Sequence, residues 1–198
     1  MQLKFDWLIV LENLQRGIMV TDANLEGPGG PLIIYINRAW MKMTGYDRAD
    51  VRGKTPRILQ GKHTNQALLR EIKQKLLKRE CFRGQTWNYR KNGEPFLMNW
   101  CCYAIYGELG KPLYYVAEHE DVTAIESLRL KLRLLADPHD PEANEFFAVL
   151  NEYKEARQQQ PGLGEPSLAQ ANGPLPQVGL PSATRIAAPL PSMSTGGF

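Results

Sequence analysis

A two-residue turn, Asn92-Gly93, constrains this chain more than any other feature of its sequence. It separates two runs that are rich in aromatic residues, CFRGQTWNYRK (81–91) and EPFLMNWCCYAIYG (94–107). Asn-Gly favours the tight turn between two antiparallel strands, because both residues accept a positive φ. The sequence therefore predicts a β-hairpin here, and a third strand-like run, PLYYVAEHEDVT (112–123), follows it.

The first half of the chain alternates between strand-like and helix-like patterns. GIMVTDANL (17–25) and LIIYIN (32–37) are β-rich runs on either side of a Gly- and Pro-rich loop. Helical spacing of apolar residues follows at 38–46 and again at 64–79. The order of two strands, several helices and three more strands predicts an α+β fold, in which a five-stranded antiparallel sheet carries short helices on one face.

Further helical patterns flank this core. Residues 5–16 carry apolar side chains at helical spacing and end at Gly17, which predicts a short amphipathic helix before the first strand. After the sheet, a second pattern predicts a helix at 124–136. Asp140, as a cap in front of Pro141, then begins another helix, which we expect to end near residue 157.

The helix predicted at 124–136 carries a regular apolar stripe over about two heptads, with the spacing of a coiled-coil seam. The stripe consists of Ile125, Leu128, Leu132 and Leu135. It either packs on the sheet of its own domain or pairs with a second copy as a short dimeric coiled coil. Two heptads alone are marginal for a coiled coil, and the sequence leaves both alternatives open.

Composition separates the folded part from the end of the chain. Residues 158–198 hold 7 of the 14 prolines and 6 of the 17 glycines, but only two charged residues. Such a segment buries too little apolar surface to fold, so we expect it to be disordered. The predicted organisation is an N-terminal helix (1–16), a sheet domain (17–123), a helical extension (124–157) and this tail.

Composition also excludes several classes of protein. The formal net charge of +3 is too small to indicate binding to nucleic acid. The wholly apolar runs, such as those at 7–11 and 100–106, are far shorter than the ~20 residues of a membrane span, so we expect no association with a membrane. Three cysteines without a C-x-x-C pair indicate neither a disulfide framework nor a metal site, which favours a reduced, cytoplasmic protein.

Taken together, the motifs of residues 17–123 resemble a PAS domain. The chain reads I-I-Y-I-N, A-W-x-x-M-T-G-Y, G-K-T-P-R-I-L-Q-G, W-N-Y-R-K-N-G-E-P-F and a closing H-E-D-V-T, in unbroken order. Each motif is loose by itself, but the set at these spacings is specific. The resemblance implies the PAS fold and a role in sensing or signalling.

Within PAS domains, the chain is most similar to the group that includes the flavin-binding LOV photosensors. The LOV signature is G-x-N-C-R-F-L-Q, in which the Cys forms a light-driven bond to flavin. This chain reads G-K-T-P-R-I-L-Q at 53–60, with Thr55 in place of Asn and Pro56 in place of Cys. Proline offers no nucleophile, so the adduct chemistry of LOV domains is excluded at this position.

The resemblance nevertheless implies a set of cofactor-binding residues. Arg57 and Gln60 match positions that contact the flavin tail, where a guanidinium would pair with a phosphate. Asn88 matches one of two asparagines that read the ring edge, since a carboxamide both donates and accepts hydrogen bonds. Met98 stands at the position of the second asparagine. The adjacent Asn99 cannot take its role, because it points to the opposite face of a strand.

His119 completes the set, since it stands where LOV domains carry a Gln that hydrogen-bonds the ring. Each of these four side chains also has an ordinary structural interpretation, as a residue that stabilises the fold: His119, Asn88, Arg57 and Gln60. The residues alone therefore assure no cofactor, and FMN is the one that the resemblance implies. One of Cys101 and Cys102 must face inward, where a small buried thiol is the usual use.

Two functions fit these observations. The first is a non-enzymatic PAS module that senses a ligand or recognises a protein, and transmits the signal through its C-terminal helices. The second is a LOV-like flavin sensor of blue light or redox state that lacks the adduct cysteine. The sequence contains no nucleophile–base pair, phosphate loop or metal-ligand spacing that would indicate an enzyme. We expect a homodimer that acts on a separate effector or signalling protein.

Overall fold

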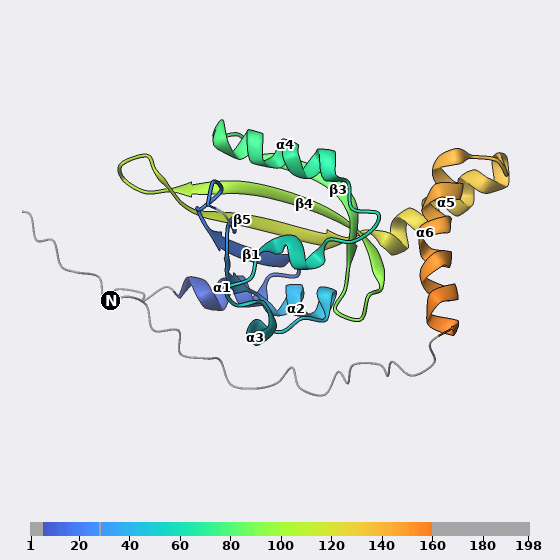
Figure 1. Cartoon of the computed structure of the whole chain (residues 1–198), viewed down its shortest axis with the longest axis horizontal. Helices are drawn as coiled ribbons and strands as arrows, with labels where there is room; N and C mark the ends of the chain where they lie inside the picture. Colours follow the sequence, from blue (N-terminus) through green and yellow to red (C-terminus); the bar gives the residue numbers. More distant parts are fainter. Residues whose placement is uncertain (1–5, 28, 160–198) are drawn as a thin grey trace, which may run out of the picture. The chain divides into compact units, whose positions relative to one another are not determined.

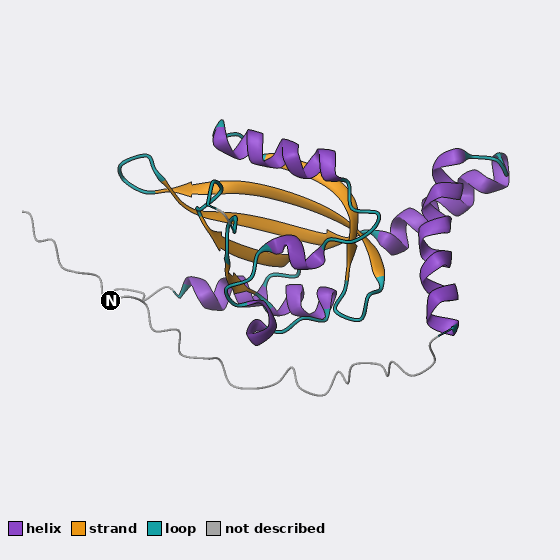
Figure 2. Cartoon of the chain, in the orientation of Figure 1, coloured by secondary structure: helices purple, strands orange, loops and turns teal. Residues whose placement is uncertain are grey.

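A five-stranded antiparallel sheet forms the centre of the computed structural model, which describes residues 6–27 and 29–159 (Figures 1 and 2). The strands lie in the order β2-β1-β5-β4-β3. Their bounds are β1 Gly17–Asp22, β2 Ile33–Ile36, β3 Phe82–Tyr89, β4 Pro95–Tyr106 and β5 Pro112–Asp121. All five predicted strands and the α+β fold class are therefore confirmed.

The predicted hairpin between β3 and β4 is present, but its turn differs from the expected one, because only Gly93 has a positive φ, of 82°. The N–H of Gly93 donates to the carbonyl of Arg90 at 2.9 Å, so Lys91 and Asn92 are the central residues of the turn. The backbone N–H of Arg90 donates to the carbonyl of Glu94 at 2.9 Å and closes the turn. Pairing then runs without interruption from Tyr89 opposite Pro95 to Phe82 opposite Cys102. This register fixes which side chains of β4 face each side of the sheet.

Short helices pack against the sheet, as Figure 1 shows for α2 and α4. Their bounds are α2 Arg38–Thr44, α3 Arg48–Val51, the 3₁₀ helix η1 Pro56–Leu59 and α4 Gln66–Leu77. Asn37 caps α2 through the N–H of Trp40, and Gly45 ends it in the left-handed region at a φ of 75°. Asn65 caps α4, which was expected to begin there. The irregular stretch before α4 contains η1, because Pro56 suits the first position of a helix.

The main core lies between these helices and the sheet. Its fully buried members include Trp40 of α2, Phe82 and Phe96 of the hairpin, and Ile33 and Ile36 of β2. Aromatic and branched side chains from distant parts of the sequence therefore meet in one cluster. Burial of such side chains contributes about 1.5 to 3 kcal/mol each, which makes this cluster the main source of stability.

The first helix, α1, spans Trp7–Asn13 and is shorter than the predicted 5–16. It buries none of its side chains, and Trp7 and Val10 of its expected apolar face are exposed. The helix is instead held by polar contacts. The carboxamide of Asn37 donates to the carbonyl of Leu11 at 2.9 Å, and Glu12 binds Arg48 at 2.6 Å.

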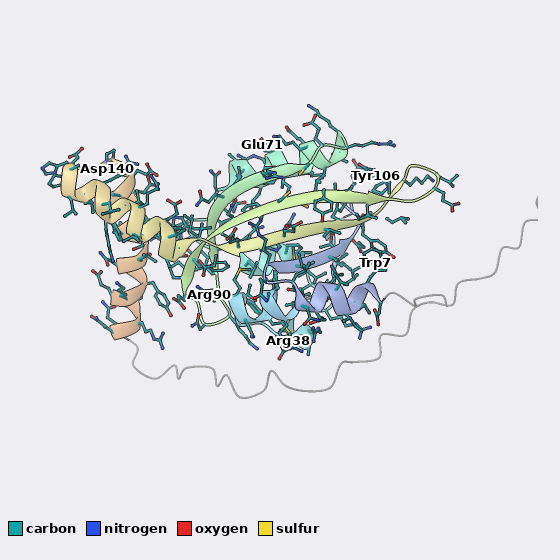
Figure 3. The ribbon with its side chains drawn as sticks, turned by 180° about the vertical axis from the view of Figure 1, so that it is seen from behind. Trp7, Arg38, Glu71, Arg90, Tyr106 and Asp140 are labelled. Carbon is teal, nitrogen blue, oxygen red and sulfur yellow. The ribbon has the colours of Figure 1, made fainter. Side chains whose placement is uncertain are left out.

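Two helices leave the sheet, α5 at Thr123–Ala136 and α6 at Pro141–Gln158. They form a second cluster in which Leu130, Ala143 and Phe146 pack with Trp87 and Leu97 of the hairpin. Figure 3 shows Asp140 at the end of this helical hairpin that lies farthest from the sheet. There Asp140 accepts a hydrogen bond from the N–H of Ala143, as predicted for the cap of α6.

The apolar stripe of α5 does not pack on the sheet of its own domain. Its four members are between 60% and 83% exposed: Ile125, Leu128, Leu132 and Leu135. The face that α5 buries instead contains Leu130, because α6 folds back against that side. The alternative that the stripe packs on the sheet of its own domain is therefore wrong. Pairing of the stripe with a second copy stays a prediction.

The tail predicted at 158–198 lies outside the described residues, apart from Gln158 and Gln159 at the end of α6. Within residues 6–27 and 29–159, no helix is long and apolar enough to cross a membrane. The same residues contain no cluster of three or more His, Cys, Asp or Glu side chains that would suit a metal ion.

Candidate functional site

A cavity of about 610 Å³ lies between the inner face of the sheet, η1 and α4. Ligand-binding cavities commonly measure about 300 to 1,000 Å³, so this one has room for a small organic molecule. Its walls are mainly apolar. Sheet and α4 side chains make up most of this apolar wall, namely Met19, Leu69, Ile72, Leu76, Met98, Trp100, Tyr115 and Ala117.

The strand register explains how β4 and β5 build one wall. Successive residues of a strand point to opposite faces, and Trp100 pairs with His119 while Cys102 pairs with Ala117. All four side chains therefore face inward and line the cavity. Alternation along β5 likewise places Tyr115, Ala117 and His119 on this one face.

His119 is the most unusual residue of the cavity wall. Its side chain is only 3% exposed, and its Nδ1 has no hydrogen-bond partner within the described residues. Burial lowers the pKa of the imidazole from 6.5 to about 4, against a weaker raising effect of a backbone hydrogen bond with Gly17. The ring is therefore neutral near pH 7, and a buried polar atom left unpaired costs about 1 to 3 kcal/mol.

Asn88, on β3, is the second buried polar side chain of the wall, at 4% exposure. The carboxamide donates to the carbonyl of Thr86 at 3.5 Å, which is long for a hydrogen bond. Most of its capacity to donate and accept is therefore unused among the residues that the structure describes. Asn88 and His119 together offer hydrogen bonds to a molecule in the cavity.

Arg57 and Gln60 lie at η1, where the cavity reaches the surface. Arg57 is exposed, Gln60 is half-buried, and both contribute to the lining. Two further cations that the sequence did not single out, Arg70 and Lys73 of α4, line the same cavity. The site thus combines an apolar interior with basic side chains that could pair with an anionic group.

The departures from the LOV pattern also lie at this cavity. Thr55 and Pro56 line it, and Met98 faces into it while the neighbouring Asn99 is exposed. Met98 therefore occupies the expected inward position. Of the two adjacent cysteines, Cys102 is the one that faces inward, and burial raises the pKa of its thiol to about 12.

Sequence reasoning missed Trp100, Tyr115 and the basic residues of α4 as parts of the site. The signals for them were present. Trp100 alternates with Met98 along β4, and Arg70 and Lys73 are three residues apart on α4. A strand or helix pattern gives the face of a side chain, but not which two faces will enclose a cavity.

Comparison with known proteins places these residues in context. A family model described as "PAS domain" matches residues 16–124 of the chain. Protein TWIN LOV 1 of Arabidopsis thaliana is 31% identical over 128 residues, which are 64% of this chain and 31% of that protein. Blue-light-activated histidine kinase 1 of Erythrobacter litoralis is 32% identical over 123 residues, which are 60% of this chain and 34% of that protein. The chain thus spans about a third of the length of these relatives.

Solved structures with the same fold include the LOV domain of a blue-light-activated histidine kinase from Erythrobacter litoralis. It is 28% identical with a TM-score of 0.50, covering 55% of this chain and 97% of that one. An RNA-binding light-oxygen-voltage receptor is 23% identical with a TM-score of 0.57, covering 65% of this chain and 35% of that one. The latter likeness concerns the fold alone.

Proposed function

Because this chain belongs to the PAS domain family, we propose that it is a sensory signalling module whose cavity binds a small ligand. One observation carries the proposal: the buried and unpaired Nδ1 of His119 in the wall of a cavity of about 610 Å³. A ligand with a polar ring edge would satisfy both this nitrogen and the carboxamide of Asn88. An acidic tail on the ligand would suit Arg57 at the entrance.

The route from the cavity to the C-terminal helices is short. His119 lies two residues before Asp121, the last residue of β5, whose carboxylate accepts hydrogen bonds from the backbone and hydroxyl of Thr123 at 2.9 and 2.6 Å. Thr123 begins α5, and Arg90 holds the same carboxylate at 2.5 Å. Figure 3 shows Arg90 beside the end of the sheet from which α5 leaves. A ligand that shifts His119 therefore acts on the residues that position α5.

The signal is a change in the balance between two arrangements of α5 and α6. A ligand shifts this balance only by its difference in affinity for the two arrangements. We infer a homodimer that pairs through the exposed stripe of α5, so that the helices of two copies rearrange together. The output is recognised by a separate effector protein, and the proposal assigns no catalytic activity to this chain.

The test is the mass of the native protein. Native mass spectrometry of the purified full chain, as isolated and after incubation with a small-molecule extract of bacterial cells, should reveal one bound molecule per chain. Ala117→Phe fills the cavity from the inner face and should abolish this complex. Val116→Phe, on the opposite face of the same strand, is the matched control and should retain it. A folded wild-type protein with only its bare mass in both conditions would refute the proposal.

The second candidate function is a light or redox sensor that binds a flavin nucleotide and lacks the adduct cysteine of LOV domains. Two observations favour it: the blue-light-activated kinase among the relatives, and the common location of Arg57, Gln60, Asn88 and His119 at one cavity. A bound flavin would supply absorption of blue light and electron-transfer chemistry. Asn88 and His119 would then orient the ring edge, and Arg57 would hold the phosphate.

The absorption spectrum separates this candidate from other ligands. A yellow protein with flavin bands in the blue region, weakened by His119→Phe or Asn88→Leu, would support the flavin sensor. A colourless protein that does not quench the fluorescence of added FMN would exclude it. In that case, a complex detected by native mass spectrometry would still support a sensor of another ligand.

A further inference from the structure

Two cysteine thiols lie in contact on the face of the sheet that is turned away from the cavity. The Sγ atoms of Cys81 and Cys101 are 3.2 Å apart, and both residues are free cysteines. Cys81 immediately precedes β3 and is exposed, while Cys101 lies on β4 and is half-buried. Cys81 and Cys101 are therefore open to a small reagent from solvent.

The strand register keeps this pair apart from the third cysteine. Arg83 pairs with Cys101, so Cys81 is a diagonal neighbour of Cys101 on the same face. Cys102 points to the opposite face, where it lines the cavity. Burial raises the pKa of the Cys101 thiol and raises that of Cys102 to about 12, but only Cys101 lies within reach of Cys81. Selective pairing of Cys81 with Cys101 follows from this arrangement.

The geometry allows a covalent bond after a small adjustment. A disulfide needs sulfur atoms about 2.05 Å apart and Cα atoms within about 7 Å, and diagonal neighbours across two strands lie at or just beyond that limit, so the backbone must move slightly. Cys81 is outside β3, so it can move without breaking the ladder that begins at Phe82. The two sulfurs thus approach each other at a point where the chain is free to adapt.

We propose that Cys81 and Cys101 form a reversible intramolecular disulfide when the protein meets a peroxide. The exposed thiolate of Cys81 attacks one peroxide oxygen, the O–O bond breaks, and a sulfenic acid forms while hydroxide leaves. The thiolate of Cys101 then attacks the Cys81 sulfur, the S–O bond breaks and a second hydroxide leaves. The two thiols lose two protons and two electrons in total, hydrogen peroxide is reduced to two waters, and a dithiol reductant restores the thiols.

The bond would tie the start of β3 to β4. The segment that it closes, 81–101, contains Asn88 of the cavity wall together with Trp87 and Leu97, which pack against the C-terminal helices. The disulfide would therefore restrain the hairpin that connects the cavity with α5 and α6. Formation of the bond does not require the proposed ligand, because Cys81 and Cys101 lie on the other face of the sheet.

Peptide mapping tests the proposal on the full chain. The protein is reduced, freed of reductant, diluted and treated with hydrogen peroxide, and its remaining thiols are blocked under denaturing conditions. The number of blocked thiols should fall from three to one. Trypsin should then release the peptide 80–83 joined to the peptide 92–129, and dithiothreitol should separate them.

Single substitutions identify the partners. Cys102→Ser should retain the joined peptides, whereas Cys81→Ser and Cys101→Ser should each abolish them. Three free thiols after peroxide, bonds only between different chains, or over-oxidation of Cys81 without a cross-link would each overturn the proposal. A bond that disappears in Cys102→Ser would overturn it as well, and circular dichroism verifies that every variant is folded.

Discussion

The Nε2 atom of His63 lies 3.0 Å from Oε2 of Glu152, and this contact joins the loop before α4 to α6. The same carboxylate holds Lys62 through its other oxygen at 2.7 Å. The loop follows η1 directly, and η1 lines the cavity. The second C-terminal helix is therefore connected to the cavity wall by a route that does not pass through β5.

Lys62 should lower the pKa of Glu152, with a smaller contribution from His63. A carboxyl group with a lowered pKa stabilises the fold above its unfolded pKa and loses this effect as the pH falls through its folded value. NMR titration of the Glu152 carboxyl should therefore give a midpoint below the ordinary range for Glu, and Lys62→Ala should raise it. An unchanged midpoint in Lys62→Ala would contradict the contact. Lys154→Ala, on the same helix, is the control.

The neutral His119 predicts a second dependence on pH. Its pKa is about 4 in the folded protein and near 6.5 when unfolded, so the unfolded state binds more protons between these values. Protonation of His119 should therefore contribute a fall of about 3 kcal/mol in the free energy of unfolding as the pH is lowered from about 6.5 to about 4. Denaturant unfolding of wild type and His119→Gln over this range measures the difference. Parallel curves for the two proteins would contradict a buried, neutral imidazole.

Leu130 should be the residue of α5 that matters most for stability. It is 2% exposed and packs with Ala143 and Phe146, whereas Leu132 is 60% exposed on the same helix. Leu130→Ala should cost about 2 to 5 kcal/mol, because it leaves a cavity in the second cluster. Lys131→Ala, at an exposed position of the same helix outside the apolar stripe, is the matched control and should change the free energy of unfolding by less than about 0.5 kcal/mol. Equal effects would mean that α5 does not pack as described.

The exposed stripe of α5 should determine the mass in solution. Leu128→Asp with Leu132→Asp places charges on an apolar seam, so it should convert a dimer into a monomer without unfolding the chain. Light scattering measures the mass, and circular dichroism checks the fold. The matched control, Lys131→Asp with Lys154→Asp, changes two exposed residues of the C-terminal helices and should leave the mass unchanged. If the mass is the same in all three proteins, the stripe does not mediate dimer formation.

Local signals were sufficient for the elements of the fold. The Asn92-Gly93 turn predicted its hairpin, and alternation along the strand correctly placed Met98 inward and Asn99 outward. These predictions succeed because a turn signal and a period of two depend on neighbouring residues, although the turn has a positive φ at Gly93 and not at Asn92.

Interactions between distant segments could not be predicted in the same way. The spacing of α1 favoured an apolar face, yet the helix is held by the polar side chains of Asn37 and Arg48. The contact between Cys81 and Cys101 depends on the register of two strands, which the spacing of cysteines does not contain. In both cases, tertiary contacts override the local sequence pattern.

Hydrogen exchange of α5 tests the central claim, that the state of the cavity is communicated to the C-terminal helices. The amides of Thr123–Ala136 should exchange at clearly different rates in the ligand-loaded wild type and in the cavity-filled Ala117→Phe variant. Val116→Phe, which leaves the cavity open, should match the loaded wild type. Exchange rates in α5 that are identical in all three proteins, with changes confined to η1 and α4, would contradict the account.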